Sequence, residues 1–324
     1  MTQNSNMEKP GTGRFSGSVP PGAHRNHIAA VTGCDSGFGH KLAKLLSEMG
    51  AQVFAGVLDL NGAGAQQLRE HGSEGLQVLQ LDVTDRSQVQ MAHQHICAQV
   101  GDAGLWALVN NAGILHCPVD VELHPMSVYR RCMEVNFLAA VNMCQVFLPL
   151  LRRSRGRVVN VCSLAGDVPI PTYAAYGASK AALSIFSKVM RLELSAWGVR
   201  VAVVQPTGFR TNIFGNSDNL NRYRDEILSG ISSEAREDYG EPYISSLLGR
   251  LSQMPGLVSE DLGPVVDDMC HALLAVRPRA VYGPGALGWL LPFLHRWCPT
   301  AAFDAIISKA FKHDCEPAGL RRTP

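Results

Sequence analysis

Short runs of Val, Leu, Ile and Ala alternate along the chain with longer stretches in which apolar residues recur every three or four positions. Runs of the first kind are typical of strands buried on both faces, and stretches of the second kind indicate amphipathic helices. Strands are expected at 27–32, 52–58, 76–83, 105–110, 157–162, 199–205 and 280–282. The main helices are expected between them, at 40–49, 127–151 and from Tyr173 to Gly198. This alternation predicts an α/β fold: a doubly wound parallel sheet of the Rossmann type, with helices on both faces, in a single domain.

Three segments depart from this alternation. Residues 1–26 are polar and rich in Gly, Ser, Pro and Asn, which predicts a disordered leader without a signal peptide or membrane anchor. The domain is expected over 27–300, and it includes a polar excursion at 207–258 that is expected to hold two short helices and to bind substrate. Ser259 is expected to cap the helix that follows. Residues 301–324 are expected to form a C-terminal extension.

The composition of the 324 residues excludes several classes of protein. The formal net charge is +1 and no basic run is interleaved with aromatic residues, so nucleic acid is not an expected partner. The nine Cys residues are dispersed and form no Cys-x-x-Cys pair, which indicates reduced thiols rather than a disulfide framework. No group of His and Cys has the spacing of a metal site, so no metal is expected.

A glycine-rich stretch, TGCDSGFG at 32–39, lies directly between the first expected strand and the first expected helix. Gly33, Gly37 and Gly39 provide a tight turn and let the backbone approach a pyrophosphate, with Ser36 beside it. The phosphates of a dinucleotide would then lie at the positive end of the helix. The sequence therefore predicts a dinucleotide site at this turn.

Polar residues at the ends of the next strands indicate which dinucleotide binds. Asp59 follows the second strand, where a carboxylate accepts hydrogen bonds from the ribose hydroxyls and repels a 2′-phosphate, so the expected cofactor is NAD rather than NADP. The alternative is that Asp59 is an exposed loop residue. Asp82 and Val83 are expected at the adenine. Asn110 and Ala112, within NNAG at the end of the fourth strand, are expected to let the backbone approach the cofactor.

Tyr176 and Lys180 stand four residues apart in a helical run, so their side chains share one helix face. A phenol beside an ammonium group makes a proton acceptor, because the cation favours the phenolate. The alternative is a solvated helix face, which is the usual interpretation of an isolated Tyr-x-x-x-Lys.

These motifs together resemble the short-chain dehydrogenase/reductase family. The resemblance rests on T-G-x-x-x-G-x-G, N-N-A-G, a Ser thirteen positions before the Tyr, and Y-x-x-x-K, over residues 28–211. Longer stretches, including TGCDSGFGHKLA and YGASKAA, are similar to the branch that holds oxidative hydroxysteroid and retinol dehydrogenases. VFAGVL, MRLELSAWG and EDYGEPYI look most like its 17β-hydroxysteroid members, whereas AGDVPIP looks more like its 11β-hydroxysteroid members.

The resemblance implies a reaction and a catalytic tetrad of Asn136, Ser163, Tyr176 and Lys180. Tyr176 would take the proton of an alcohol, and Lys180 would lower the pKa of Tyr176 and hold the nicotinamide ribose. Ser163 would donate a hydrogen bond to the substrate oxygen. Asn136 would hold a water that links Lys180 to solvent; alternatively it is a helix Asn bonded to its own backbone.

The implied reaction is the NAD-dependent oxidation of a steroid secondary alcohol to a ketone, estradiol to estrone or testosterone to androstenedione. An 11β-hydroxysteroid such as cortisol, or retinol, is the alternative substrate. A non-catalytic NAD-binding regulator would be expected to lack the Tyr, Lys or Ser, and all three are present.

One motif departs from the family pattern. The family usually has Pro-Gly after the sixth strand, and here Pro206 is followed by Thr207 and Gly208. The β-branched Thr207 is expected to restrict the backbone where the nicotinamide lies. Pro206 and Thr211 are still expected to contact the cofactor.

The resemblance also implies a homodimer, paired through the Tyr176 helix and the long helix before it, and association with the endoplasmic reticulum membrane. Steroid-oxidising relatives carry apolar segments ahead of the dinucleotide domain and residues 1–26 do not, so a cytoplasmic location is the alternative. No stretch of the sequence is expected to be a clean transmembrane helix. Residues 287–297 suit a helix at a membrane surface, the wall of an apolar site, or ordinary core.

Overall fold

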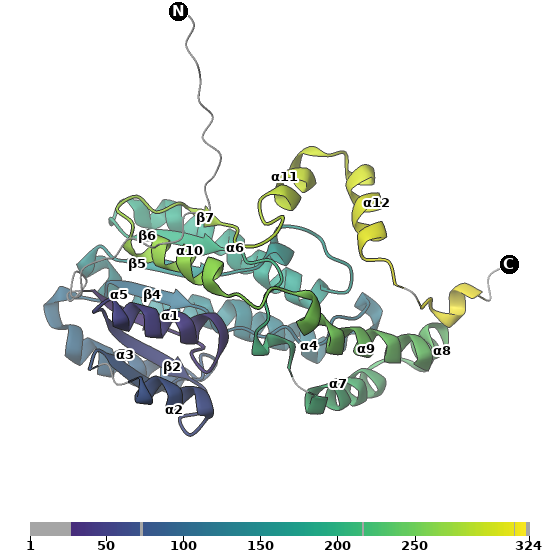
Figure 1. The fold of residues 1–324 in the computed structure, drawn as a ribbon, viewed down its shortest axis with the longest axis horizontal. Coiled ribbons are helices and arrows are strands. Elements are labelled where there is room, and N and C mark those ends of the chain that lie inside the picture. Colours follow the sequence, from purple (N-terminus) through teal and green to yellow (C-terminus); the bar gives the residue numbers. More distant parts are fainter. Residues whose placement is uncertain (1–26, 72–73, 216, 314, 322–324) are drawn as a thin grey trace, which may run out of the picture.

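A computed structural model describes residues 27–71, 74–215, 217–313 and 315–321, so the expected leader lies outside the described residues. Seven parallel strands form one sheet in the order β3-β2-β1-β4-β5-β6-β7 (Figure 1). The strands are β1 (Ile28–Val31), β2 (Gln52–Val57), β3 (Leu76–Gln80), β4 (Ala107–Asn110), β5 (Arg157–Val161), β6 (Arg200–Val204) and β7 (Val281–Tyr282). The predicted doubly wound sheet is confirmed, because its order reverses direction at β1 and β4.

Helices cover both faces of the sheet, as the hydrophobic periodicity predicts. On one face lie α1 (Gly37–Glu48), α2 (Ala63–Glu70) and α10 (Gly263–Leu274), which bury Leu42, Leu68 and Met269 against the strands. On the other lie α3 (Arg86–Val100), α5 (Ala139–Ser154) and α6 (Ala174–Ser195). The strands are nearly continuous in apolar residues because each one contacts both layers.

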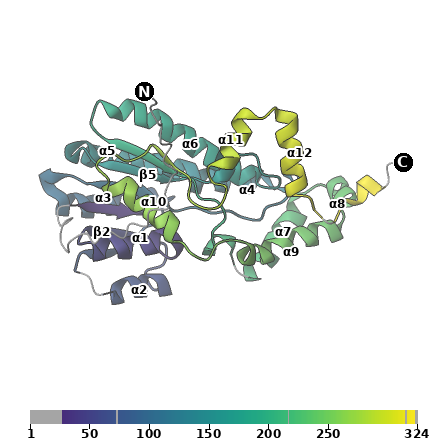
Figure 2. The same cartoon turned by 45° about the horizontal axis from the view of Figure 1, so that its top comes forward.

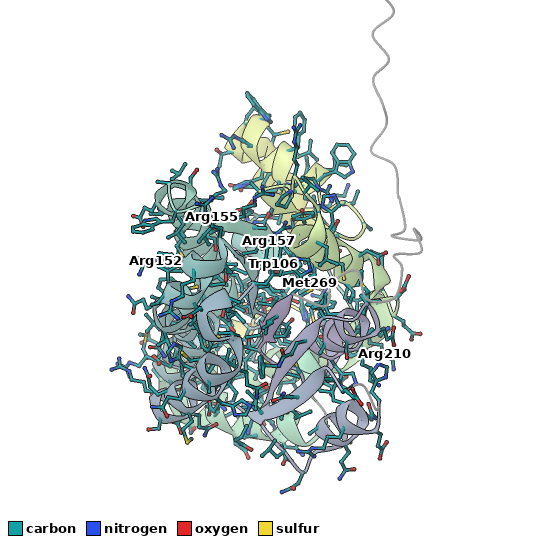
Figure 3. All side chains as sticks on the ribbon, turned by 90° about the vertical axis from the view of Figure 1, so that its left-hand side faces the viewer. Trp106, Arg152, Arg155, Arg157, Arg210 and Met269 are labelled. Atoms are coloured by element: carbon teal, nitrogen blue, oxygen red, sulfur yellow. The ribbon has the colours of Figure 1, made fainter. Side chains whose placement is uncertain are left out.

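The edge of the sheet where the strands begin is held together by Arg157 and Trp106. The Arg157 guanidinium lies over the Trp106 ring, 5.0 Å from its centre, and donates to the Ala272 carbonyl of α10 at 2.9 Å (Figure 3). Arg157 is buried, and burial lowers its pKa to about 10. This edge is therefore structural, and the opposite edge, where the strands end, is left for ligands.

The excursion after β6 contains three helices, so the prediction of two short ones is wrong. They are α7 (Ser217–Gly230), α8 (Ser233–Tyr239) and α9 (Glu241–Leu257), and they extend away from the sheet (Figures 1 and 2). The third helix is 17 residues long because one of its faces packs on the segment after β4: Tyr243, Ile244 and Leu247 share a cluster with Val119 and Leu123.

The helix after the excursion begins later than expected. Ser259 does not cap it: α10 begins at Gly263, and the Asp261 carboxylate accepts from the Gly263 amide at 2.9 Å. After β7 the chain forms two further helices, α11 (Leu290–Trp297) and α12 (Thr300–Ala310), which stand apart from the sheet in Figures 1 and 2.

One continuous helical stretch, Met126–Ser154, is long and apolar enough to cross a membrane by length and composition, contrary to the expectation that none is. It consists of α4 (Met126–Met133), the π-helical turn η3 (Glu134–Leu138) and α5. Its most apolar window is 44% buried, and α5 contributes Met143 and Phe147 to the core under the sheet. Its apolar character is accounted for by that packing.

Candidate active site

The ends of the strands open into one cavity of about 1260 Å³. Its walls include the turn after β1, the segments after β3, β4, β5 and β6, and parts of α4, α7 and α9. Its wall contains residues predicted to hold the cofactor and, from the excursion, both apolar residues such as Phe214 and Met254 and the cations Arg222 and Arg250. Tyr176, Lys180 and Ser163 also lie in its wall. The cavity therefore has the layout needed to bring a cofactor and a second molecule together.

The glycine-rich turn fits a pyrophosphate. Gly33 and Gly37 have positive φ values of 67° and 65°, which a residue with a side chain rarely adopts. A Cβ on Gly39 would lie 2.5 Å from the Asn111 amide nitrogen and 2.6 Å from the Gly33 carbonyl oxygen, so this glycine allows α1 to pack closely against the turn. Ser36 precedes α1 without capping it through its side chain, which leaves the first amides of the helix for an anion.

Asp35 is a site residue that the sequence reasoning missed. Its carboxylate accepts hydrogen bonds from the Leu58 amide at 2.9 and 3.0 Å and from the Asp59 amide at 3.2 Å, and it lines the cavity. Asp59, the residue predicted to bind the ribose, is exposed, does not line the cavity, and accepts from the Asn61 amide at 2.9 Å. Of Asp35 and Asp59, only Asp35 lines the cavity. The feature of the sequence that could have identified Asp35 is the presence of an acidic residue inside the glycine-rich turn.

Both residues predicted to lie at the adenine line the cavity. Asp82 and Val83 lie in its wall, and the Asp82 carboxylate accepts from the Thr84 amide and hydroxyl at 2.9 and 2.7 Å.

Of the two asparagines at the end of β4, the second faces the turn. The Asn110 side chain is buried away from the cavity and donates to Asn160 of β5 at 2.8 Å. Asn111 lines the cavity and donates to the Thr32 and Gly33 carbonyls at 2.9 and 3.0 Å. Ala112 also lines it, and a Cβ on Gly33 would lie 2.8 Å from its Cα. Asn111 thus fixes the glycine-rich turn, a role that the sequence reasoning did not assign.

Tyr176, Lys180 and Ser163 lie together because the first turns of α6 pass over the end of β5. Lys180 is 3% exposed, its ammonium donates to the Val161 carbonyl at 2.9 Å, and it lies 5.8 Å from the centre of the Tyr176 ring. Ser163 follows β5 and is hydrogen-bonded to Tyr176. A phenol, an ammonium group and a hydroxyl therefore meet in the cavity wall, as expected.

The acidity of Tyr176 differs from the expectation. Burial raises the pKa of the phenol to about 12, and the hydrogen bond with Ser163 opposes this rise. Burial also lowers the pKa of Lys180. Both changes have one physical cause: the cavity wall disfavours the charged form of each group. The expected lowering of the Tyr176 pKa by Lys180 is not found; the desolvation of the phenolate sets the direction of the shift.

Asn136 lies in the π-helical turn and is 1% exposed. Its side-chain amide donates to the Ile114 carbonyl and to the Ser179 hydroxyl, both at 2.9 Å, and its oxygen accepts from the Ile114 amide at 2.8 Å. The alternative that it bonds to its own helix backbone is thereby excluded. Asn136 joins the segment after β4 to the helix of Tyr176, and π-helical turns often occur at functional sites.

The residues after β6 also line the cavity. Pro206 accepts from the Leu164 amide at 3.0 Å, and a Cβ on Gly37 would lie 3.2 Å from the Thr211 methyl group. The Thr207 amide donates to the Pro284 carbonyl at 3.1 Å. A Cβ on Gly285, which has a φ of 105°, would clash with the Thr207 hydroxyl. Thr207 is thus accommodated by a glycine in the segment after β7.

The far end of the cavity carries the apolar side chains of Ile170, Phe214, Met254 and Phe311 and the ring of Tyr173. Arg222 and Arg250 also lie in its wall.

A polar pair also lies at this end. His116 lines the cavity and has a positive φ of 62°, and its Nε2 lies 3.1 Å from the Glu226 carboxylate of α7. Burial lowers the pKa of His116. The pair joins α7 to the segment after β4 across the cavity wall.

Comparisons with known proteins agree with this geometry. Residues 27–221 match the sequence profile of the family described as short chain dehydrogenase. The chain is 47% identical over 291 residues to estradiol 17-beta-dehydrogenase 2 of Mus musculus, covering 90% of this chain and 76% of that protein. It is 42% identical to 11-beta-hydroxysteroid dehydrogenase type 2 of Oryctolagus cuniculus, covering 90% and 72%. A short-chain dehydrogenase from Streptomyces avermitilis shares the fold, with a TM-score of 0.69 and 23% identity over 89% of this chain and 99% of the other. The chain therefore belongs to the short-chain dehydrogenase/reductase family, whose members bind NAD or NADP and act on CH–OH groups.

Proposed function

We propose that this enzyme oxidises the secondary alcohol of a steroid to a ketone with NAD, and that its substrate is a 17β-hydroxysteroid such as estradiol or testosterone. The observation that carries the proposal is the meeting of Tyr176, Ser163 and Lys180 in the wall of a cavity with a cofactor end and an apolar end. An apolar ligand fits the second end, and the likeness to estradiol 17-beta-dehydrogenase 2 favours position 17β.

Each side chain of the site has a defined task in this oxidation. Ser163 donates a hydrogen bond to the substrate oxygen and so places the hydroxyl beside the Tyr176 oxygen. Tyr176, as phenolate, accepts the hydroxyl proton. Lys180 supplies the positive charge next to that phenolate and is itself held by the Val161 carbonyl. When bound at the glycine-rich turn, NAD supplies the acceptor for the hydride that leaves the carbinol carbon.

The preference for NAD over NADP rests on the Asp35 carboxylate. It lies inside the glycine-rich turn, lines the cavity, and is fixed by the Leu58 and Asp59 amides. A fixed negative charge there opposes a 2′-phosphate and accepts hydrogen bonds from ribose hydroxyls. We assign this task to Asp35 rather than to Asp59, because Asp59 is not among the residues that line the cavity.

An 11β-hydroxysteroid is the second candidate substrate. The segment AGDVPIP at 165–171 resembles the 11β-hydroxysteroid branch, and its residues Ala165 and Ile170 line the cavity. A retinoid would meet the same catalytic side chains, so only the shape of the apolar end separates the three substrates.

We also propose that two copies pair through α6 and the long helical stretch before it, Met126–Ser154. Ile185, Val189 and Leu192 lie on one face of α6 and are 60%, 46% and 67% exposed, which is unusual for large apolar side chains in a helix of the catalytic core. A second copy would bury them, as the likeness to the family suggests. The likeness also favours a location at the endoplasmic reticulum membrane over the cytoplasm.

A substrate panel tests the proposed function. Estradiol, testosterone, cortisol and all-trans-retinol would each be incubated with the purified chain and NAD or NADP, and reduced cofactor would be followed by absorbance. We expect turnover of the first two with NAD. Turnover of cortisol or retinol alone would replace the substrate and keep the chemistry. Cofactor binding without turnover of any of the four would contradict the proposal and favour a non-catalytic NAD-binding protein.

A further inference from the structure

The helices α11 and α12 form a hairpin beside the active-site cavity. One side of the hairpin is packed against the segment that follows Ser163, where Leu164 and Val168 are buried under apolar residues of the two helices: Leu291, Leu294, Cys298, Phe303 and Ile307. Phe311, directly after α12, lines the apolar end of the cavity. The hairpin is therefore fixed to the wall of the site.

The other side of α11 carries a stripe of aromatic residues. Trp289, Phe293 and Trp297 are spaced four residues apart, so they lie along one face of the helix. They are 70%, 54% and 71% exposed. The packed residues of α11 lie on the opposite face, so the stripe has no part in holding the hairpin in place. Exposing three large aromatic side chains side by side to water is energetically unfavourable, and an apolar patch of this kind indicates a surface that binds a protein or a membrane.

The charge nearest the stripe favours an anionic partner. Arg296 lies beside Trp297 in the last turn of α11. The two helices of the hairpin together carry Arg296 and Lys309 against a single carboxylate, Asp304. Tryptophan, phenylalanine and basic residues on a short amphipathic helix are the composition of helices that lie in the headgroup region of a bilayer.

A second copy of the chain is a poorer partner for this stripe. Three aromatic side chains bury about 150–250 Å² each when covered completely. At the exposures given above, they offer roughly 300–500 Å², whereas each partner of a stable interface contributes about 800 Å². A bilayer has no such requirement, because the stripe inserts into it.

We propose that α11 binds the surface of an anionic membrane by inserting Trp289, Phe293 and Trp297 among the lipid headgroups. Because the hairpin forms part of the cavity wall, the apolar end of the site then lies next to the bilayer. A steroid dissolved in the membrane would reach the site without crossing water. This last consequence rests on the proposed function; the membrane binding itself does not.

Vesicle flotation tests the binding. The full chain would be mixed with phosphatidylcholine vesicles, with and without phosphatidylserine, and the bound fraction measured after flotation. The triple variant Trp289→Ser, Phe293→Ser, Trp297→Ser removes the stripe. The matched control is Trp197→Ser, which removes a 55% exposed tryptophan that stands beside Arg152 near the end of α6. Circular dichroism would show that each variant is folded.

We expect the wild type and the Trp197 variant to float with the vesicles, with a larger bound fraction when phosphatidylserine is present. The affinity of the triple variant for the same vesicles should be lower by at least about tenfold. Tryptophan fluorescence of the Trp197→Phe chain should be quenched by brominated lipids. Absence of vesicle binding by the wild type, or equal binding by the triple variant, would overturn the proposal. The proposal would also be overturned if light scattering showed an oligomer for the wild type that is lost in the triple variant, because the stripe would then join copies of the chain.

Discussion

Replacing Asn136 by alanine removes the connection between the segment after β4 and the helix of Tyr176. The side chain makes three hydrogen bonds in a site that is 1% exposed. Its loss leaves the Ile114 amide, the Ile114 carbonyl and the Ser179 hydroxyl without that partner. Each buried polar group left unpaired costs about 1–3 kcal/mol. The three groups together would cost roughly 3–9 kcal/mol if they stayed dry. Because water from the neighbouring cavity can enter part of the space left by the Asn136 side chain, we expect the free energy of unfolding to fall by the lower value, about 3 kcal/mol.

The loss should also reach the chemistry, because Ser179 lies next to Lys180 and its hydroxyl bonds to the Tyr176 carbonyl at 2.7 Å. We expect kcat to fall more than tenfold, since small displacements of reacting groups are costly. Urea unfolding and steady-state kinetics would measure both effects. The control is Asn142→Ala, a half-buried position of α5 whose side chain forms no hydrogen bond with the described residues. Equal unfolding free energies for the two variants would refute this reasoning.

Three further predictions follow from the charges of the site. Because burial raises the pKa of Tyr176 to about 12, the rate of alcohol oxidation should rise with pH above neutrality; a flat profile of kcat against pH would argue against the phenolate as base. Asp35→Ala should shift the ratio of kcat/KM for NAD and NADP toward NADP by about tenfold, while Asp59→Ala changes it little; the reverse order would return the specificity role to Asp59. His116 and His124 are buried and their pKa values are lowered, so protonation of either ring favours the unfolded chain. The free energy of unfolding should therefore be highest above about pH 6.5 and fall at lower pH by up to about 1.4 kcal/mol per pH unit for each histidine. In the variants His116→Gln and His124→Gln, the urea midpoint should change less between neutral and acid pH.

The central sheet could be predicted because its signal is local. Each core strand or helix is an apolar run or periodic stretch followed by a residue that ends it: Gly33 follows β1 and Gly50 follows α1, both with positive φ values. The excursion after β6 could not be predicted in the same way. Its third helix is stabilised by Tyr243 and Leu247 packing on the segment after β4, more than 100 residues earlier in the chain, and no local pattern encodes that contact.

The catalytic side chains could be predicted because the ends of parallel strands meet at one edge and Tyr176 and Lys180 share a helix face. The cofactor edge was predicted less well. Asp35 and Asn111 lie within the motifs that were recognised, but their tasks depend on hydrogen bonds to Leu58 and to the Gly33 carbonyl, which only the folded chain brings within reach. The pKa of Tyr176 could not be inferred from Lys180 alone, because it also depends on burial.

Hydride transfer assisted by Tyr176 is the central claim, and an isotope measurement tests it most directly. Estradiol carrying deuterium at the 17α position would be oxidised with NAD by the wild type, by Tyr176→Phe and by Tyr173→Phe, and the nucleotide analysed by mass spectrometry. Tyr173 is the matched control because its ring lies 6.3 Å from that of Tyr176 in the same cavity wall. We predict deuterium in the reduced nucleotide for the wild type and the Tyr173 variant, and none for the Tyr176 variant. Transfer that survives in Tyr176→Phe, or reduced nucleotide without deuterium, would contradict the account.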